Sequence, residues 1–170
     1  MKKSDLMLKK RKLILVRHAK AESLALNDRT RRLSLEGESK AFKVAEHLKT
    51  KVELPTRWIS SPAIRAYHTA DIFLNVFREN TPYPQIKLEE KLYDFSINGL
   101  KEVICAMEDS YDRIILFGHN SAIPEFINAY TNFSIDEFAP SSVAILELEL
   151  DKWAYFKEAK LKELIDSKIF

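Results

Sequence analysis

The sequence predicts an α/β protein in which a mostly parallel central sheet lies between two layers of helices. Short, largely apolar runs typical of buried strands occur at 13–16, 57–60 and 114–117. Segments with apolar residues at helical spacing separate these runs. The resulting order, β-α-β-α-β-α-β-α-β, is typical of a three-layer α/β/α sandwich.

The first half of the chain supplies two strands and two helices. The first strand ends at Arg17 and His18, and a polar connection follows over 19–32. A helix is expected to begin near Ser34, because apolar residues then recur on one helical face at Ala41, Val44, Ala45 and Leu48. The strand at 57–60 runs into Ser61 and Pro62. Serine at the N-cap and proline at the first helical position predict that the next helix begins there.

The second half continues the same alternation. Residues 85–89 alternate like an exposed edge strand. A third helix places Leu100, Val103, Ile104 and Met107 on one face. After the strand at 114–117, residues 121–130 are typical of a helix and 143–150 of a strand. The last segment, 152–170, is compatible with either a helix or a strand.

Length and composition favour one globular domain. The 170 residues are 46% hydrophobic and 31% charged, which is ordinary for a soluble protein. We expect a basic N-terminal tail over 1–11 and a single domain over 12–170. The tail lacks the apolar core of a signal peptide, and the single cysteine, Cys105, fits a reducing compartment. These features predict a cytoplasmic location.

The charge pattern excludes several partner classes. A net charge of +2 argues against a nucleic-acid binder, and no apolar run reaches the length of a membrane helix. A monomer is expected. The three glycines, Gly37, Gly99 and Gly118, are too far apart to form a glycine-rich phosphate loop. Any phosphate must therefore be bound mainly by side chains.

Chemistry-bearing side chains follow three strands at the point where each strand ends. Arg17 and His18 end the first strand, Arg65 follows the second, and His119 follows the strand at 114–117. Ligands of open α/β sheets bind at the carboxyl ends of the strands. Guanidinium groups fork onto phosphate oxygens, and a neutral imidazole can form a covalent phosphohistidine. The pattern therefore predicts a phosphate site that contains a nucleophile.

Three sequence blocks resemble the signatures of the histidine phosphatase superfamily, whose fold is phosphoglycerate mutase-like. The blocks are Leu15 to Lys20, Ser60-Ser61-Pro62 with Arg65-Ala66 and Thr69-Ala70, and Gly118-His119-Asn120. The small size and the Arg-His-Ala-Lys form resemble the SixA-type phosphohistidine phosphatase branch. The segment Arg31-Arg32-Leu33-Ser34 followed by Gly37 is similar to that branch's Arg-Pro-Leu-Thr block, with Arg32 in place of the usual proline.

The resemblance implies a role for each matched residue. His18 would be the nucleophile that becomes phosphorylated, and Arg17, Arg65 and a cationic His119 would complete the phosphate pocket. Arg17, Arg65, Arg31 and Asn120 would bind the substrate. Larger members of the superfamily add a carboxylic acid that protonates the leaving group. This chain has no clear equivalent, and the candidates are Glu22 and Asp94.

The implied activity is that of a metal-independent phosphohistidine phosphatase without a cofactor. Its substrate would be a phosphohistidine-bearing signalling or phosphotransfer protein, and a compact fold with few insertions predicts a shallow, open site. The alternative is a small-molecule phosphomonoesterase of the same superfamily that acts on a small phosphorylated substrate. A metallohydrolase is disfavoured because His-Glu-x-x-His and Cys-x-x-Cys spacings are absent. A phospho-binding module without turnover is the remaining class.

Overall fold

The computed structural model describes residues 8–78 and 84–170. Within these residues, six strands form one sheet in the order β3-β2-β4-β1-β5-β6. The strands are β1 (Lys9–Arg17), β2 (Arg57–Ser60), β3 (Ile86–Leu88), β4 (Arg113–Gly118), β5 (Val143–Leu150) and β6 (Lys160–Ile165). The first four in sheet order are parallel, and β5 is antiparallel to β1 and β6. The predicted mostly parallel sheet is confirmed.

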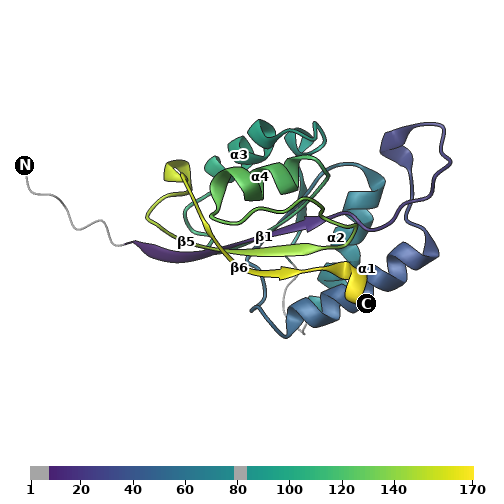
Figure 1. The fold of residues 1–170 in the computed structure, drawn as a ribbon, viewed down its shortest axis with the longest axis horizontal. Helices are drawn as coiled ribbons and strands as arrows, with labels where there is room; N and C mark the ends of the chain where they lie inside the picture. Colours follow the sequence, from purple (N-terminus) through teal and green to yellow (C-terminus); the bar gives the residue numbers. More distant parts are fainter. Residues whose placement is uncertain (1–7, 79–83) are drawn as a thin grey trace, which may run out of the picture.

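Helices cover both faces of this sheet, as Figure 1 shows. They are α1 (Leu35–Lys49), α2 (Ile64–Phe77), α3 (Ile97–Cys105) and α4 (Ala122–Tyr130), with 3-10 turns η1 (Asp28–Thr30), η2 (Glu90–Leu92), η3 (Trp153–Tyr155) and η4 (Ser167–Ile169). Side chains of α1 and α2 enter one buried apolar cluster, and those of α3 and α4 enter the other. The three-layer sandwich is therefore confirmed. Among the described residues, no helix is long and apolar enough to cross a membrane.

Strand β1 lies inside the sheet and is apolar on both faces. Leu13 and Leu15 join the cluster beneath α3 and α4, whereas Ile14 and Val16 join the cluster of α1 and α2. All four side chains are fully buried. A strand covered on both faces has no polar face, which explains the continuous apolar run in the sequence.

The strands β1, β2 and β4 end level with one another. Arg17 pairs with Gly118 across β1 and β4, and Ser60 pairs with Phe117 across β2 and β4. Since these strands are parallel, the residues that follow each strand emerge at one edge of the sheet.

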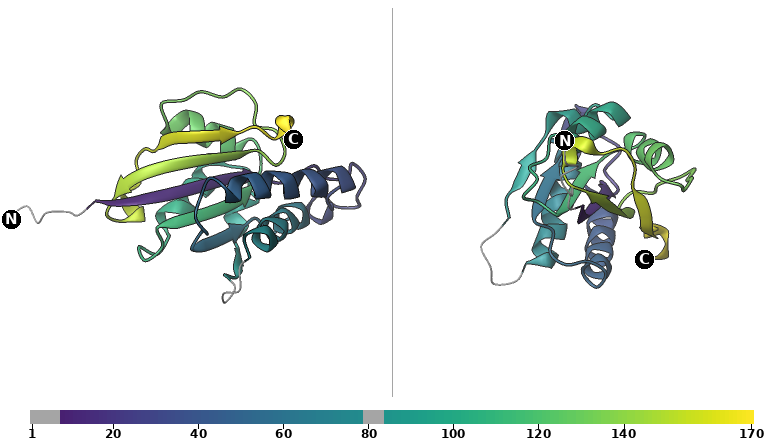
Figure 2. Two further views of the ribbon diagram at one scale, coloured as in Figure 1. Left: turned by 90° about the horizontal axis from the view of Figure 1, so that it is seen from below. Right: turned by 90° about the vertical axis from the view of Figure 1, so that its left-hand side faces the viewer.

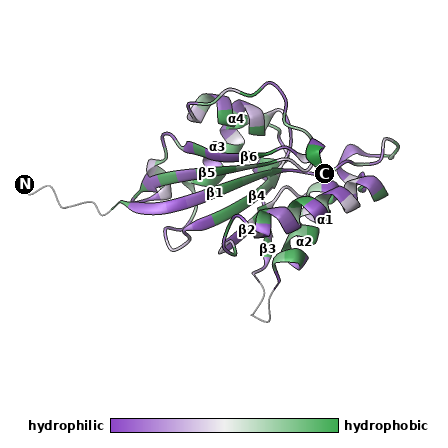
Figure 3. Ribbon diagram, turned by 60° about the horizontal axis from the view of Figure 1, so that its bottom comes forward, coloured by the Kyte–Doolittle hydropathy of each residue, from purple (hydrophilic) through white to green (hydrophobic). Residues whose placement is uncertain are grey.

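The predicted boundary between a tail over 1–11 and the domain is wrong, because β1 already begins at Lys9. Residues 1–7 lie outside the described part of the chain. The start of β1 is hydrophilic (Figure 3), yet the Arg11 side chain is buried. Its guanidinium donates to the carbonyl oxygens of Leu150 (3.2 Å), Tyr111 (2.7 Å) and Asp151 (2.7 Å). A basic sequence thus supplies a strand, because backbone carbonyls accept from the buried guanidinium and the carboxylate of Asp112 pairs with its charge at 3.4 Å.

The start of α2 differs from the expected position, and the structure assigns the C-terminal segment that the sequence left undecided. Helix α2 begins at Ile64, with Ala63 at the N-cap, rather than at Ser61-Pro62. The reason is that Ser61 continues the pairing with β4: its N–H donates to the Phe117 carbonyl (2.9 Å). The segment 152–170, for which the sequence was compatible with a helix or a strand, contains the strand β6 beside β5 at the sheet edge (Figure 2). The expected edge strand is β3, and Ser34 caps α1 by accepting from the N–H of Gly37.

Candidate active site

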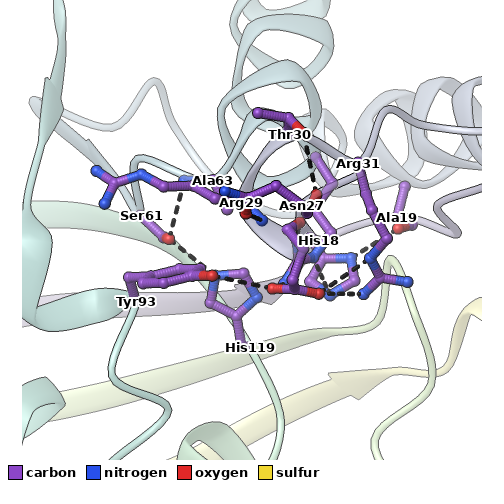
Figure 4. A network of polar contacts seen from close by, with 12 residues as sticks. His18, Ala19, Asn27, Arg29, Thr30, Arg31, Ser61, Ala63, Tyr93 and His119 are labelled. Atoms are coloured by element: carbon purple, nitrogen blue, oxygen red, sulfur yellow. Dashed lines mark hydrogen bonds and ion pairs between the residues drawn. The ribbon is translucent and has the colours of Figure 1, made fainter. Parts of the chain in front are cut away.

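The ends of β1, β2 and β4 bring both predicted histidines to one place. His18 follows β1, and its N–H donates to the carbonyl of Gly118 (3.0 Å), the last residue of β4. His119 follows Gly118, and its ring centroid lies 5.0 Å from that of His18. Arg65, in the first turn of α2, donates from Nε to Nε2 of His18 (3.2 Å). Figure 4 shows the two imidazoles in this cluster.

The His18 ring is held as a neutral imidazole with a defined tautomer. Its Nδ1 lies 2.7 Å from the Ala19 carbonyl oxygen, which can only accept, so Nδ1 carries the hydrogen. Nε2 is then the basic nitrogen, which agrees with its accepting a bond from Arg65. Burial above all lowers the pKa of His18 to about 4, and the Arg65 and Arg17 charges lower it further against the Ala19 bond. Near pH 7 the ring is therefore uncharged, as a nucleophile must be.

His119 is neutral as well in this structure, and its cationic form in the presence of a phosphoryl group stays a prediction. Burial above all, followed by the neighbouring His18 and Arg65, lowers its pKa to about 2. Its Nε2 bonds to the Ser61 hydroxyl (2.8 Å). Its Nδ1 is buried and has no hydrogen-bond partner among the described residues. A buried nitrogen of this kind is suited to meet a ligand.

Arg17 and Asn120 share one anchor. Nη1 of Arg17 (2.8 Å) and Nδ2 of Asn120 (3.0 Å) both donate to the carbonyl oxygen of Phe138. Within the described part of the chain, Nε of Arg17 and Oδ1 of Asn120 are buried without a partner. The shared carbonyl fixes both side chains at the edge of the cluster, and Arg17 keeps a free donor there.

A carboxylate that sequence reasoning missed, Asp28 of η1, completes the polar network. Its Oδ2 accepts from Nη2 of Arg65 (3.0 Å) and from the Tyr93 hydroxyl (3.1 Å). Its Oδ1 accepts from Nε of Arg31 (3.0 Å) and forms an ion pair with Nη2 of the same guanidinium (2.9 Å). Burial tends to raise the pKa of Asp28, but the bonds from Arg65 and Tyr93 outweigh it and leave the pKa below its usual value. Asp28 is thus ionised near pH 7.

Comparison with known proteins identifies the family. A sequence model of the histidine phosphatase superfamily (branch 1) matches residues 13–100, just over half of the chain. The chain belongs to the histidine phosphatase superfamily. Its activity class is that of a phosphatase. No curated protein matches it in sequence.

Solved structures share the fold of this histidine phosphatase at low identity. The protein histidine phosphatase SixA complexed with tungstate has a TM-score of 0.79 at 16% identity, with 93% of this chain and 98% of that chain covered. A protein designated phosphohistidine phosphatase SixA from Agrobacterium tumefaciens gives 0.74 at 21%, covering 91% and 96%. A mycobacterial glucosyl-3-phosphoglycerate phosphatase gives 0.67 at 14%, covering 91% and 98%. These likenesses concern the fold.

The carboxylates proposed from the sequence are not part of the network in this histidine phosphatase. Glu22 and Asp94 are both exposed. None of the contacts described for the two histidines, Arg65 or Asp28 involves either of them. The only sequence signal for Asp28 was an acidic residue just before a cluster of arginines in the long connection after β1. The described residues contain no group of three or more histidine, cysteine, aspartate or glutamate side chains placed to hold a metal ion.

The site is closed, in contrast to the shallow, open site that we expected. His18 is 9% exposed, and Arg65 and His119 are each 1% exposed. The ring of Phe95 lies edge-on to His119 at 4.5 Å between centroids, and Tyr93 lies at 5.9 Å. Phe95 has a φ of 52°, in the left-handed region that a bulky residue rarely adopts, a kind of strain common at functional sites. A large hollow of about 1000 Å³ lies instead at the opposite edge of the sheet, lined by charges of both signs.

Proposed function

We propose that this histidine phosphatase hydrolyses phosphohistidine without a metal, through a covalent intermediate on Nε2 of His18. The observation that carries the proposal is the state of the His18 ring. Its hydrogen lies on Nδ1 toward Ala19, its pKa is lowered to about 4, and its basic nitrogen faces the Arg65 guanidinium. A neutral imidazole beside fixed cations is what in-line attack on a phosphoryl group requires.

The reaction would proceed in two displacements. In the first, the Nε2 lone pair is released from its bond with Nε of Arg65 and forms a bond to phosphorus. The phosphorus–nitrogen bond of the substrate breaks at the same time, and the leaving imidazole takes a proton from water. In the second, water attacks the phosphorus, the bond to Nε2 breaks, and phosphate leaves. Arg17 and Arg65 would neutralise the phosphoryl oxygens in both steps. The partnerless Nδ1 of His119 would meet the same group, whose negative charge raises the pKa of that ring.

Two features support a phosphohistidine substrate over an alkyl phosphate. The Asp28 carboxylate is ionised, so it has no proton ready for an alkoxide leaving group. An imidazole leaves more readily than an alkoxide and needs less help from an acid. The fold likeness to SixA proteins agrees with this choice. Exposed apolar side chains in the loop after His18, Leu24 (90%) and Leu26 (108%), favour a protein as the carrier of the phosphohistidine.

A small-molecule phosphomonoesterase is the second candidate. The presence of a carboxylate, Asp28, within the network favours it, because such an enzyme needs an acid near the leaving group. The fold likeness to the glucosyl-3-phosphoglycerate phosphatase points the same way. For this function Asp28 would have to gain a proton when a phosphoryl group takes over its arginines.

Phosphate release in the presence of a chelator tests the proposal. We expect the wild type to hydrolyse a phosphohistidine protein faster than p-nitrophenyl phosphate, and His18→Ala to lose at least about 10³-fold in kcat on both. His68→Ala, a change of the half-exposed histidine on α2, is the matched control and should keep its activity. Denaturing the enzyme during turnover should trap a phosphorylated wild type.

Other outcomes separate the alternatives. Activity that survives in His18→Ala would exclude this nucleophile. A wild type that works only with added divalent metal would favour a metallohydrolase. A preference for alkyl phosphates that disappears in Asp28→Asn would favour the phosphomonoesterase.

A further inference from the structure

The Asp28 carboxylate makes the contacts that a bound phosphoryl group would need. One of its oxygens lies on Arg65 and Tyr93, and the other lies on Arg31. Arg65 also donates from Nη1 to the backbone carbonyl of Asp28 (2.6 Å). Because a guanidinium holds carboxylate and phosphate oxygens in the same forked geometry, one group excludes the other.

The burial of the site shows that something must move before chemistry can occur. His18 and His119 are buried, and both His18 and Asp28 occupy the guanidinium of Arg65. Tyr93, which covers His119, is itself bonded to the Asp28 carboxylate. Asp28 is therefore one of the contacts that join the loop after β1 to the segment covering the second histidine.

We propose that Asp28 is an internal competitor for the phosphate site, and that the phosphoryl group of the substrate displaces its carboxylate from Arg65 and Arg31. This inference rests on the proposed function, since it concerns the ligand of the same site. Asp28 then sets the affinity that an anion needs in order to displace the carboxylate and open the site.

Displacement is feasible because Asp28 lies at the boundary with solvent. Its side chain is 47% exposed, whereas that of Arg65 is 2% exposed. The carboxylate can therefore turn outward into water while the guanidinium stays in place. A phosphoryl dianion offers the same two cations more charge than a carboxylate does. It can also meet Nε of Arg17 and Nδ1 of His119, which are buried and have no partner among the described residues. The ion pair of Arg29 with Glu90 (2.5 Å) holds the loop near the site meanwhile.

The test is the affinity for inorganic phosphate, measured by calorimetry at pH 7.5 and constant ionic strength. We expect Asp28→Asn to bind phosphate about tenfold more tightly than the wild type, because an amide competes weakly for the two guanidiniums. Tyr93→Phe, which removes one contact of the carboxylate and no charge, should tighten binding by a smaller factor. Equal or weaker binding in both variants would overturn the proposal, since it would mean that Asp28 orients the arginines for phosphate.

A control and an activity assay separate the possible causes. Glu36→Gln removes an exposed carboxylate that pairs with Lys20, and should change phosphate affinity less than twofold. A gain as large as that of Asp28→Asn would attribute the effect to net charge and refute the competition. Tighter phosphate binding in an enzyme that leaves phosphohistidine intact would keep this inference and remove the proposed function. Hydrolysis of phosphohistidine by the wild type, with no gain of phosphate affinity in Asp28→Asn, would keep the proposed function and refute this inference.

Discussion

At the scale of single residues, one hydroxyl links the two halves of the site. Thr69 is fully buried on α2. Its Oγ1 accepts from the N–H of Ala19 (2.9 Å) and donates to the carbonyl of Arg65 (2.6 Å). The backbone that follows His18 is thereby tied to the helical turn that carries Arg65. Thr69 is a positioning residue, because its effect on the site passes through these two neighbours.

Replacing Thr69 tests this link. Thr69→Val keeps the shape but leaves the N–H of Ala19 buried without an acceptor, which we expect to cost about 1–3 kcal/mol in the free energy of unfolding. The kcat of the folded variant should fall about tenfold, because His18 and Arg65 would no longer be held in a fixed position relative to each other. Urea unfolding and phosphatase assays measure the two effects. Thr69→Ser retains the hydroxyl and should restore kcat; a serine variant as slow as the valine variant would contradict the role.

Residue types predicted the centre of the site but not its outer contacts. Arg17, His18, Arg65 and His119 were identifiable because each follows a strand in a distinctive block, and the level strand ends place them together. Asp28 was missed because it acts through the path of an irregular loop, which has no periodic signal. The lowered pKa of His119 could not be predicted for a different reason, since burial is a property of the packed fold.

At the scale of elements, the start of α1 packs against the backbone of the nucleophile loop. Ser34 donates its N–H to the carbonyl of Lys20 (3.0 Å), two residues after His18. A Cβ atom built on Gly37, in the first turn of α1, would clash with that same carbonyl oxygen. The close approach of a helix to a loop therefore requires glycine at this position.

Gly37→Ala should consequently move either the helix or the loop. We expect a loss of about 1–3 kcal/mol in stability, despite the higher helix propensity of alanine, together with a lower kcat. Ser39→Ala, at an exposed position of the same helix, is the matched control and should leave stability within about 0.5 kcal/mol. Thermal unfolding and phosphatase assays of the two variants decide the matter. A fully active, equally stable Gly37→Ala would show that the contact is not needed.

Local signals predicted elements well where one chemical reason acted alone. The cap at Ser34 and the continuous apolar run of β1 correctly located α1 and the central strand. The Ser61-Pro62 signal failed because pairing with β4 competes with capping for Ser61. The start of β1 was hidden by its basic residues, since the acceptors of Arg11 come from chain segments 100 and 140 residues away.

At the scale of the whole molecule, the fold buries two uncharged imidazoles close to Arg17 and Arg65. The pKa of His18 is lowered to about 4 and that of His119 to about 2, in each case mainly by burial. An unfolded histidine has a pKa near 6.5. Between pH 6.5 and about 4, the unfolded chain therefore binds protons that the folded chain does not. Stability must fall as the pH falls through this window.

Unfolding in urea at pH 7 and pH 5 measures this dependence. We expect the two histidines to lower the free energy of unfolding by on the order of 1–2 kcal/mol each on going from pH 7 to pH 5. His119→Asn removes one titrating ring, so its free energy of unfolding should fall less between pH 7 and pH 5 than that of the wild type. The free energy of unfolding of His68→Asn should fall as much as that of the wild type. The lowered pKa of Asp28 contributes stability that is lost only near and below pH 4, outside this window. An unchanged pH dependence in His119→Asn would mean that the pKa of His119 is the same in the folded and the unfolded chain, which would contradict the effect of burial on this ring.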